Sequence, residues 1–226
     1  FIHGFNVSFD EAAVRAAQIG CDLKVTGPMG FYSWPSRGRV ANYSADEATI
    51  ESSEPYIQEF LSRFVRSTGC RRVHLLVHSM GNRGLLRIVQ RIYQDKKDEV
   101  NFGQAFLCAP DVDRDTFRNL AAAYTAITDR TTLYINPEDI ALGVSRWKHG
   151  GEPRAGLSPP VTVVSGIDTI EVGEFNLLEL GHGYYAQAEA VLTDMFDLLV
   201  RNVAPGKRQR PRKPAGGAAV DYWRLV

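Results

Sequence analysis

The spacing of apolar residues changes sharply near the middle of the chain. Residues 73–77 (VHLLV) form a short and mostly apolar run, which predicts a buried β-strand. Over residues 84–93 the apolar residues recur three and four positions apart, which predicts an amphipathic helix. Residues 78–81 connect the two patterns, so we expect a sharp turn from strand to helix with Ser79 at its tip.

The same two patterns recur along most of the chain. Strands are predicted at the start of the chain and over residues 28–34, 104–109, 131–135, 161–164 and 167–172, and helices over residues 8–20, 44–67, 116–127, 140–147 and 186–203. Strands that alternate with helices are typical of a mostly parallel sheet with helices on both faces. We therefore expect an α/β fold, with one domain over residues 1–203.

Two sequence signals mark expected helix starts. Ser8 is followed three residues later by Glu11, and Ser44 by Glu47. A Ser followed at this spacing by a Glu can form a capping box, in which each side chain bonds a backbone amide of the other residue. The sequence therefore predicts helix starts at both serines.

The C-terminal end differs from the rest in composition. Seven of the 26 Lys and Arg residues, but only one of the 26 Asp and Glu residues, lie from residue 201 onward, which leaves residues 1–200 with a net charge of −6. A stretch rich in Pro, Gly and basic residues buries little apolar surface, so we expect a disordered linker over residues 204–218, dispensable for chemistry. A short apolar segment, 219–226, follows it. The linker is predicted to contact an acidic surface electrostatically.

Several classes of function are disfavoured by the sequence. An acidic body within a neutral chain argues against a nucleic-acid partner. No apolar run reaches the roughly 18 residues that a transmembrane helix needs. The His, Cys and carboxylate residues show no metal-ligand spacing, and no glycine-rich phosphate loop occurs. We therefore expect no metal and no cofactor, and a small-molecule substrate.

Ser79 matches the nucleophile pattern Gly-x-Ser-x-Gly in part. The second glycine is present as Gly81, whereas Val77 stands at the first position. A serine here is also typical of a simple helix cap. The strand before it and the helix after it favour a nucleophile elbow, with the backbone N–H of Met80 pointing to a developing oxyanion.

A second motif lies close to the start of the chain. His3, Gly4 and Phe5 follow an apolar strand and precede a helix, where lipase-like enzymes place the other half of the oxyanion hole. Gly4 would let the backbone approach the substrate, the N–H of Phe5 would donate, and His3 would be scaffolding. By itself, the motif is equally typical of an ordinary glycine-containing turn.

The base is chosen among five histidines. His182 has a glycine on each side and follows the last predicted strand, which makes it the preferred base. His149 lies in a loop and stays an alternative. His74 and His78 are interpreted as structural.

The acid is chosen by its position after a strand. Asp139 follows the strand 131–135 almost directly, and Asp111 and Asp113, after the preceding strand, are the alternatives. With Asp139, the chain order is Ser, Asp, His, which is the order of α/β-hydrolases.

The remaining site residues concern the substrate pocket. We expect Asn6, Trp34 and Tyr184 to line a small pocket, although a Trp at the end of a strand packs equally well under the following loop. About 20 residues separate the strands 104–109 and 131–135, which leaves no room for a large cap domain. The sequence therefore predicts an open site that favours short acyl groups.

Six motifs together carry a family resemblance. The chain resembles the α/β-hydrolases and, more narrowly, a bacterial α/β-hydrolase domain family of unknown function. The motifs are FIHGFN (1–6), SWPS (33–36), HSMGNR (78–83), APD (109–111), DIAL (139–142) and GHGYY (181–185). The resemblance implies a hydrolase fold with a Ser-Asp-His triad and no particular substrate. It also implies an N-terminal hairpin that this chain lacks, so we expect the chain to be an excised domain.

The leading functional hypothesis is a serine hydrolase that cleaves a carboxylic ester through an acyl-enzyme. A thioesterase, an acyltransferase or a peptidase would use the same residues. The alternative from another class is a catalytically inactive hydrolase-fold module that binds a partner.

Overall fold

A central β-sheet organises the computed structural model, which describes residues 1–70, 72–95, 102–173, 185–214 and 221–226. In these residues the strands lie in the order β1-β2-β3-β4-β6-β5. The neighbours from β1 to β6 are parallel, and β5 is antiparallel to β6. The strands are β1 (Val73–His78), β2 (Phe102–Cys108), β3 (Thr128–Ile135), β4 (Ile167–Glu171), β5 (Pro211–Arg212) and β6 (Trp223–Leu225).

The start of the chain extends the sheet beyond β1. Ile2 forms parallel bridges to Val77 on one side and to Tyr32 on the other. Its amide donates to the carbonyl of Leu76 at 2.9 Å, and its carbonyl accepts from the amide of His78 at 3.0 Å. The two strands predicted here are thus reduced to single bridged residues, which nevertheless bring His3 to the end of β1.

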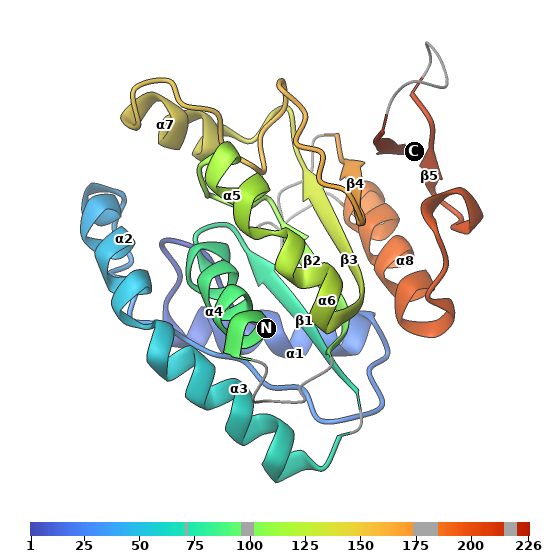
Figure 1. Ribbon diagram of the computed structural model, residues 1–226, viewed down its shortest axis with the longest axis horizontal. Helices are drawn as coiled ribbons and strands as arrows, with labels where there is room; N and C mark the ends of the chain where they lie inside the picture. Colours follow the sequence, from blue (N-terminus) through green and yellow to red (C-terminus); the bar gives the residue numbers. More distant parts are fainter. Residues whose placement is uncertain (71, 96–101, 174–184, 215–220) are drawn as a thin grey trace.

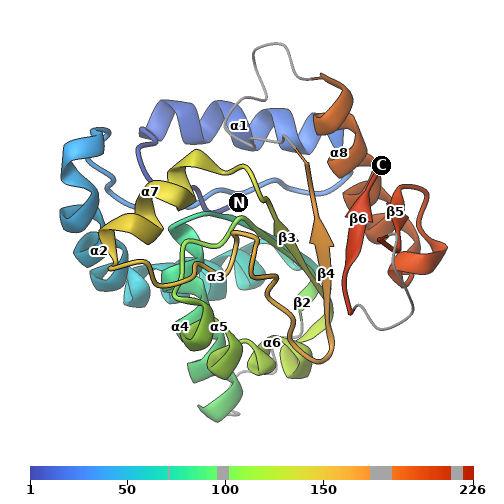
Figure 2. The ribbon, with the colours of Figure 1, turned by 90° about the horizontal axis from the view of Figure 1, so that it is seen from above.

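Helices cover both faces of the sheet (Figures 1 and 2). In Figure 2, α1 and α8 lie on one side, and α3, α4, α5 and α6 lie on the other. This arrangement confirms the predicted α/β fold. The helices are α1 (Phe9–Asp22), α2 (Tyr43–Ser52), α3 (Glu54–Thr68), α4 (Gly81–Asp95), α5 (Arg114–Leu120), α6 (Ala122–Ile127), α7 (Ile140–Lys148) and α8 (Tyr185–Arg201), with short 3-10 turns η1 (Val40–Asn42) and η3 (Pro205–Lys207).

Alternate residues of each strand supply two separate cores. Leu75 and Val77 pack with the core under α3 to α6, whereas Leu76 between them packs with α1 and α8. Side chains point to opposite faces at successive strand positions, so a strand covered on both sides must be apolar throughout. This explains why residues 73–77 show a run of apolar residues instead of an alternation.

The two predicted capping boxes have different outcomes. At Ser8 the box is confirmed, because the amide of Glu11 donates to Ser8 Oγ at 3.3 Å and the amide of Ser8 donates to Glu11 Oε2 at 2.7 Å. At Ser44 the prediction is wrong, because α2 already begins at Tyr43. Glu47 instead accepts from Arg83 at 2.6 Å, so its carboxylate is used in tertiary contacts.

The helix predicted over residues 44–67 is divided in two. α2 ends at Ser52 and α3 begins at Glu54, with Pro55 in the first turn of α3. Proline has no amide hydrogen and is tolerated at the start of a helix but not in its interior. Pro55 therefore explains the break, which the apolar periodicity alone does not reveal.

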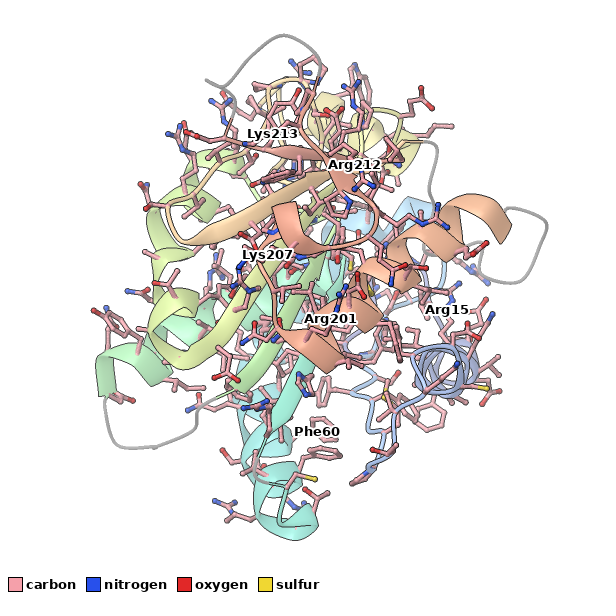
Figure 3. All side chains as sticks on the ribbon, turned by 90° about the vertical axis from the view of Figure 1, so that its right-hand side faces the viewer. Arg15, Phe60, Arg201, Lys207, Arg212 and Lys213 are labelled. Carbon is pink, nitrogen blue, oxygen red and sulfur yellow. The ribbon has the colours of Figure 1, made fainter. Side chains whose placement is uncertain are left out.

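The tail after α8 is ordered over residues 204–214, so the prediction of a disordered linker is wrong there. It forms η3 and the short edge strand β5, and β6 pairs in parallel with β4. The basic residues Lys207, Arg212 and Lys213 lie along this segment, which leads away from the end of α8 at Arg201 (Figure 3). Residues 215–218 lie outside the described residues.

The order of residues 204–214 is explained by a buried ionic contact that composition does not reveal. The side chain of Arg208 is 0% exposed and forms ion pairs with Asp168 and with Asp194, the latter at 3.2 Å. Tyr134 donates to the same Asp194 carboxylate at 2.7 Å. A guanidinium held in this way fixes the tail to β3, β4 and α8 without a large apolar surface.

Candidate active site

Ser79 lies at the tip of the turn between β1 and α4. Its φ is +49°, a left-handed value that is uncommon for a residue with a side chain. The amide of Ser79 donates to the carbonyl of Cys108 at 2.9 Å, which fixes the turn to the end of β2. The predicted strand–turn–helix is therefore confirmed, and Ser79 is partly exposed between buried neighbours.

Two glycines allow the His3–Gly4 turn to lie directly against Ser79. A β-carbon on Gly4 would stand 2.8 Å from Ser79 Cβ and 2.7 Å from His78 Nδ1. A β-carbon on Gly81 would stand 2.6 Å from the carbonyl oxygen of His3. All three distances are too short for real side chains, so the contact between the two turns requires glycine at both positions.

Two backbone amides flank this contact without a hydrogen-bond acceptor among the described residues. They belong to Phe5 and Met80, the two residues that the sequence predicts as oxyanion donors. The turn beneath them is held by Asn82, whose side-chain amide donates to the carbonyls of Val77 and Ser79 at 3.2 Å and 3.1 Å. Unpaired donors on a fixed turn are the geometry that stabilises a developing negative charge.

The histidines in the described part of this region support structure. His3 Nδ1 contacts the Gly4 carbonyl at 2.8 Å, and His3 Nε2 contacts Ser33 Oγ at 3.2 Å. Burial lowers the pKa of His78 to about 3, so that ring stays neutral at physiological pH. These positions agree with the interpretation of His3 as scaffolding and of His78 as structural.

His149, the alternative base, has both ring nitrogens occupied. Nδ1 contacts the Ser145 carbonyl at 2.7 Å, and Nε2 contacts Glu47 Oε1 at 2.8 Å. Both ring nitrogens therefore contact protein oxygens other than the Ser79 hydroxyl. His182, the preferred base, lies outside the described residues.

The predicted pocket residues have separate outcomes. Trp34 is only 1% exposed, stacks on His3 and donates from Nε1 to the His3 carbonyl at 2.8 Å. It therefore packs under the loop and does not line an open pocket, because its polar edge and its ring face are both occupied. Asn6 is exposed, and its amide donates to Ser36 Oγ at 3.0 Å. Tyr184 lies outside the described residues.

Asp139 stands between the end of β3 and the start of α7. Its Oδ1 accepts from the amide of Leu142 at 2.9 Å, so the residue caps the helix. Burial raises the pKa of Asp139, and the amide hydrogen bonds oppose this shift. No side chain of the described residues donates to this carboxylate, which therefore keeps acceptor capacity.

The two alternative acids are occupied by other contacts. Asp111 is 2% exposed, and its Oδ1 accepts from Ser145 at 2.6 Å and from Arg154 at 3.0 Å. Tyr43 donates to its Oδ2. Asp113 caps α5 by accepting from the amide of Thr116 at 2.7 Å. Asp111 is therefore the centre of a buried polar cluster.

Sequence reasoning missed the partners of Asp111. Tyr43, Ser145 and Arg154 come from α2, α7 and the loop after α7, and no motif spacing links them. Arg83, one turn after Ser79, joins the cluster by donating from Nε to the Asp111 carbonyl at 2.8 Å. The cluster ties α2 and α7 to the Ser79 turn, because the Asp111 amide donates to the Ser79 carbonyl at 3.2 Å.

A large apolar groove lies away from this site. It has a volume of about 450 Å³ and is lined by the loop 23–30, residues 73–77 of β1 and side chains of α3 and α8, including Phe60 (Figure 3). Its lining includes neither Ser79 nor the residues of the predicted oxyanion hole, Phe5 and Met80. It is therefore not the pocket of the candidate site.

Neither a metal site nor a membrane-spanning helix is found in the described part of the chain. There, no group of three or more His, Cys, Asp or Glu residues is arranged to hold a metal ion. Nor does any helix in that part have the length and apolar character needed to cross a bilayer.

The family comparison agrees with the fold and the turn geometry. The family model described as alpha/beta hydrolase of unknown function (DUF900) matches residues 1–201. The chain belongs to this family. No curated protein and no solved structure matches the chain. The matched residues include the Ser79 turn and Asp139, and they end where the tail begins.

Proposed function

We propose that the chain is a serine hydrolase that cleaves a carboxylic ester. The single observation that carries this proposal is Ser79 itself, held at φ +49° against Gly4, beside the amides of Phe5 and Met80, which have no acceptor among the described residues. Backbone strain at an exposed hydroxyl is typical of a nucleophile elbow. His182 and Asp139 complete the proposed triad.

The proposed reaction follows from these roles. His182 takes the proton of Ser79 as Oγ attacks the ester carbonyl, and the amides of Phe5 and Met80 stabilise the oxyanion. Collapse of the intermediate breaks the ester bond, and His182 gives its proton to the leaving alcohol. Water, activated in turn by His182, then releases the acid and restores Ser79. Asp139 orients the imidazole and stabilises its charged form.

Other activities would use the same residues. A thioesterase, an acyltransferase or a peptidase differs in the leaving or accepting group and not in the triad. An inactive binding module is the other class, but binding alone does not require a serine in a strained backbone conformation beside two amides that lack an acceptor in the described part of the chain. The geometry therefore favours an enzyme.

A fluorophosphonate probe tests the proposal directly. We expect the folded protein to be labelled on Ser79, and Ser79→Ala to abolish the labelling. Ser44→Ala is the matched control, because Ser44 is exposed on the neighbouring helix α2. Absence of labelling in the folded wild type would favour the binding module.

Exchanging each carboxylate for an amide distinguishes the candidate acids. We expect Asp139→Asn to lower kcat by roughly 10⁴-fold, because the amide selects the wrong imidazole tautomer. Asp111→Asn should instead cost about 3 kcal/mol of stability, because Arg154 is left buried without its counter-charge. The measurements are kcat and the free energy of unfolding for both variants, with Asp113→Asn as a third. A larger loss of kcat in Asp111→Asn, with unfolding unchanged, would move the acid to the preceding strand.

A further inference from the structure

The helix α7 exposes an apolar stripe to solvent. Ile140 is 83% exposed, Val144 54% and Trp147 82%. Residues at spacings of four and three lie on one face of a helix, so these three side chains form a continuous ridge. We call Ile140, Val144 and Trp147 the α7 ridge.

The opposite face of the same helix packs against the protein through Leu142 and Ser145, which are both buried. Ser145 is 1% exposed and donates to Asp111 at 2.6 Å, and its carbonyl accepts from His149. The inner face thus holds one apolar and one hydrogen-bonded residue, whereas the three other large apolar residues of the helix lie outside. The buried contacts fix α7 in this orientation, so the ridge stays on the outside of the folded protein.

The ridge lies at the edge of the molecule that carries the candidate active site. α7 directly follows Asp139, and Figures 1 and 2 show it beyond the carboxyl ends of the strands. Ser79 follows the carboxyl end of β1. A surface that the ridge binds would therefore meet the same edge as Ser79.

The composition and size of the ridge indicate what it binds. α7 contains Arg146 and Lys148 and no acidic residue. Arg146 Nε donates to the Gly151 carbonyl at 3.0 Å, and the Lys148 ammonium lies 4.5 Å from the centre of the Tyr43 ring. Trp with aliphatic residues on one face and basic residues beside them is typical of helices that lie in a lipid–water interface. Three side chains cover only a few hundred Å², which is well below the roughly 800 Å² per partner of a stable protein interface.

We propose that the α7 ridge docks on the surface of a phospholipid bilayer. The ridge enters the upper acyl region, and Arg146 and Lys148 contact lipid phosphates. Docking by itself does not depend on catalysis. The consequence that Ser79 acts on esters presented by a lipid surface rests on the proposed function. Docking does not conflict with the predicted preference for short acyl groups, because the ridge would contact the bilayer and not the acyl group that is cleaved.

Vesicle sedimentation tests the docking. We expect the wild type to pellet with vesicles of phosphatidylcholine and phosphatidylglycerol in a ratio of about three to one. Exchange of Ile140, Val144 and Trp147 for Ser should lower the partition coefficient at least about tenfold. The control exchanges Val14, Tyr56 and Val200 for Ser, which are 66%, 64% and 64% exposed on three other helices. This control should pellet like the wild type.

Several outcomes would overturn the proposal. These are a wild type that stays in solution with vesicles, a ridge variant that pellets as well as the wild type, and a ridge that instead mediates dimerisation in analytical ultracentrifugation. Trp147→Ser alone should weaken binding in the same direction and guards against misfolding of the triple variant. Vesicle binding without fluorophosphonate labelling would retain the docking surface and reject the hydrolase, so the two proposals fail separately.

Discussion

Ser79→Ala is expected to lower kcat for a small ester by at least about 10⁴-fold with little change in stability. The hydroxyl is the proposed nucleophile, and alanine leaves no atom that can form the acyl-enzyme. The backbone of Ser79 already adopts φ +49° at the same steric cost that alanine would have. Steady-state kinetics with a nitrophenyl ester, together with thermal unfolding, measures both effects.

His182→Ala should cause a loss of the same order, and the double variant should be little worse than either single variant. Members of a triad act as a unit, so their removal is strongly non-additive. His149→Ala is the control, since both its ring nitrogens already have partners. A His182→Ala enzyme that keeps a tenth of the activity would reject His182 as the base.

The Ser79 turn could be predicted because its signals are local. A strand covered on both faces is apolar at successive positions, and the strand, the turn and the helix follow one another directly in sequence. The need for glycine at positions 4 and 81, by contrast, comes from the contact between the two turns. The signal for α1 is local as well, because its capping box lies within four consecutive residues. Local chemistry of this kind is visible in a single sequence.

Features that depend on distant partners could not be predicted. Asp111 and Asp139 both follow a strand, and position alone does not show that only Asp111 meets Arg154 and Tyr43. Trp34 at a strand end is equally compatible with a pocket and with the stacking on His3 that it makes. The choice between such alternatives is made by tertiary contacts.

The tail after α8 is the clearest example of a structure that depends on distant partners. Its composition is that of a solvated linker, yet Arg208 is buried between two carboxylates that lie 14 and 40 positions away in sequence. The ion pairs, together with the pairing of β6 on β4, extend the sheet beyond the residues that match the family model. A basic stretch is therefore no evidence of disorder when buried acids elsewhere lack a counter-charge.

Removal of the buried Arg208 ion pairs is expected to cause a large loss of stability. Arg208→Met is expected to lower the free energy of unfolding by about 3 kcal/mol, because Asp194 stays buried without its cation. Methionine keeps much of the apolar volume of the arginine stem, so the loss reports mainly the charge. Arg212→Met, at an exposed position of the same tail, should change stability by less than about 0.5 kcal/mol. Urea denaturation of the full chain measures both variants.

The pH dependence of this loss separates charge from packing. Burial raises the pKa of Asp194 above the ordinary value of 3.8, and Arg208 opposes that shift. In Arg208→Met the pKa rises further, so the folded state of the variant binds a proton that the unfolded chain releases. The stability deficit should therefore be largest near neutral pH and should shrink as the pH falls toward about 4. A deficit of the same size at both pH values would show that Arg208 holds the tail by packing, and that the buried charge of Asp194 is not what the variant leaves uncompensated.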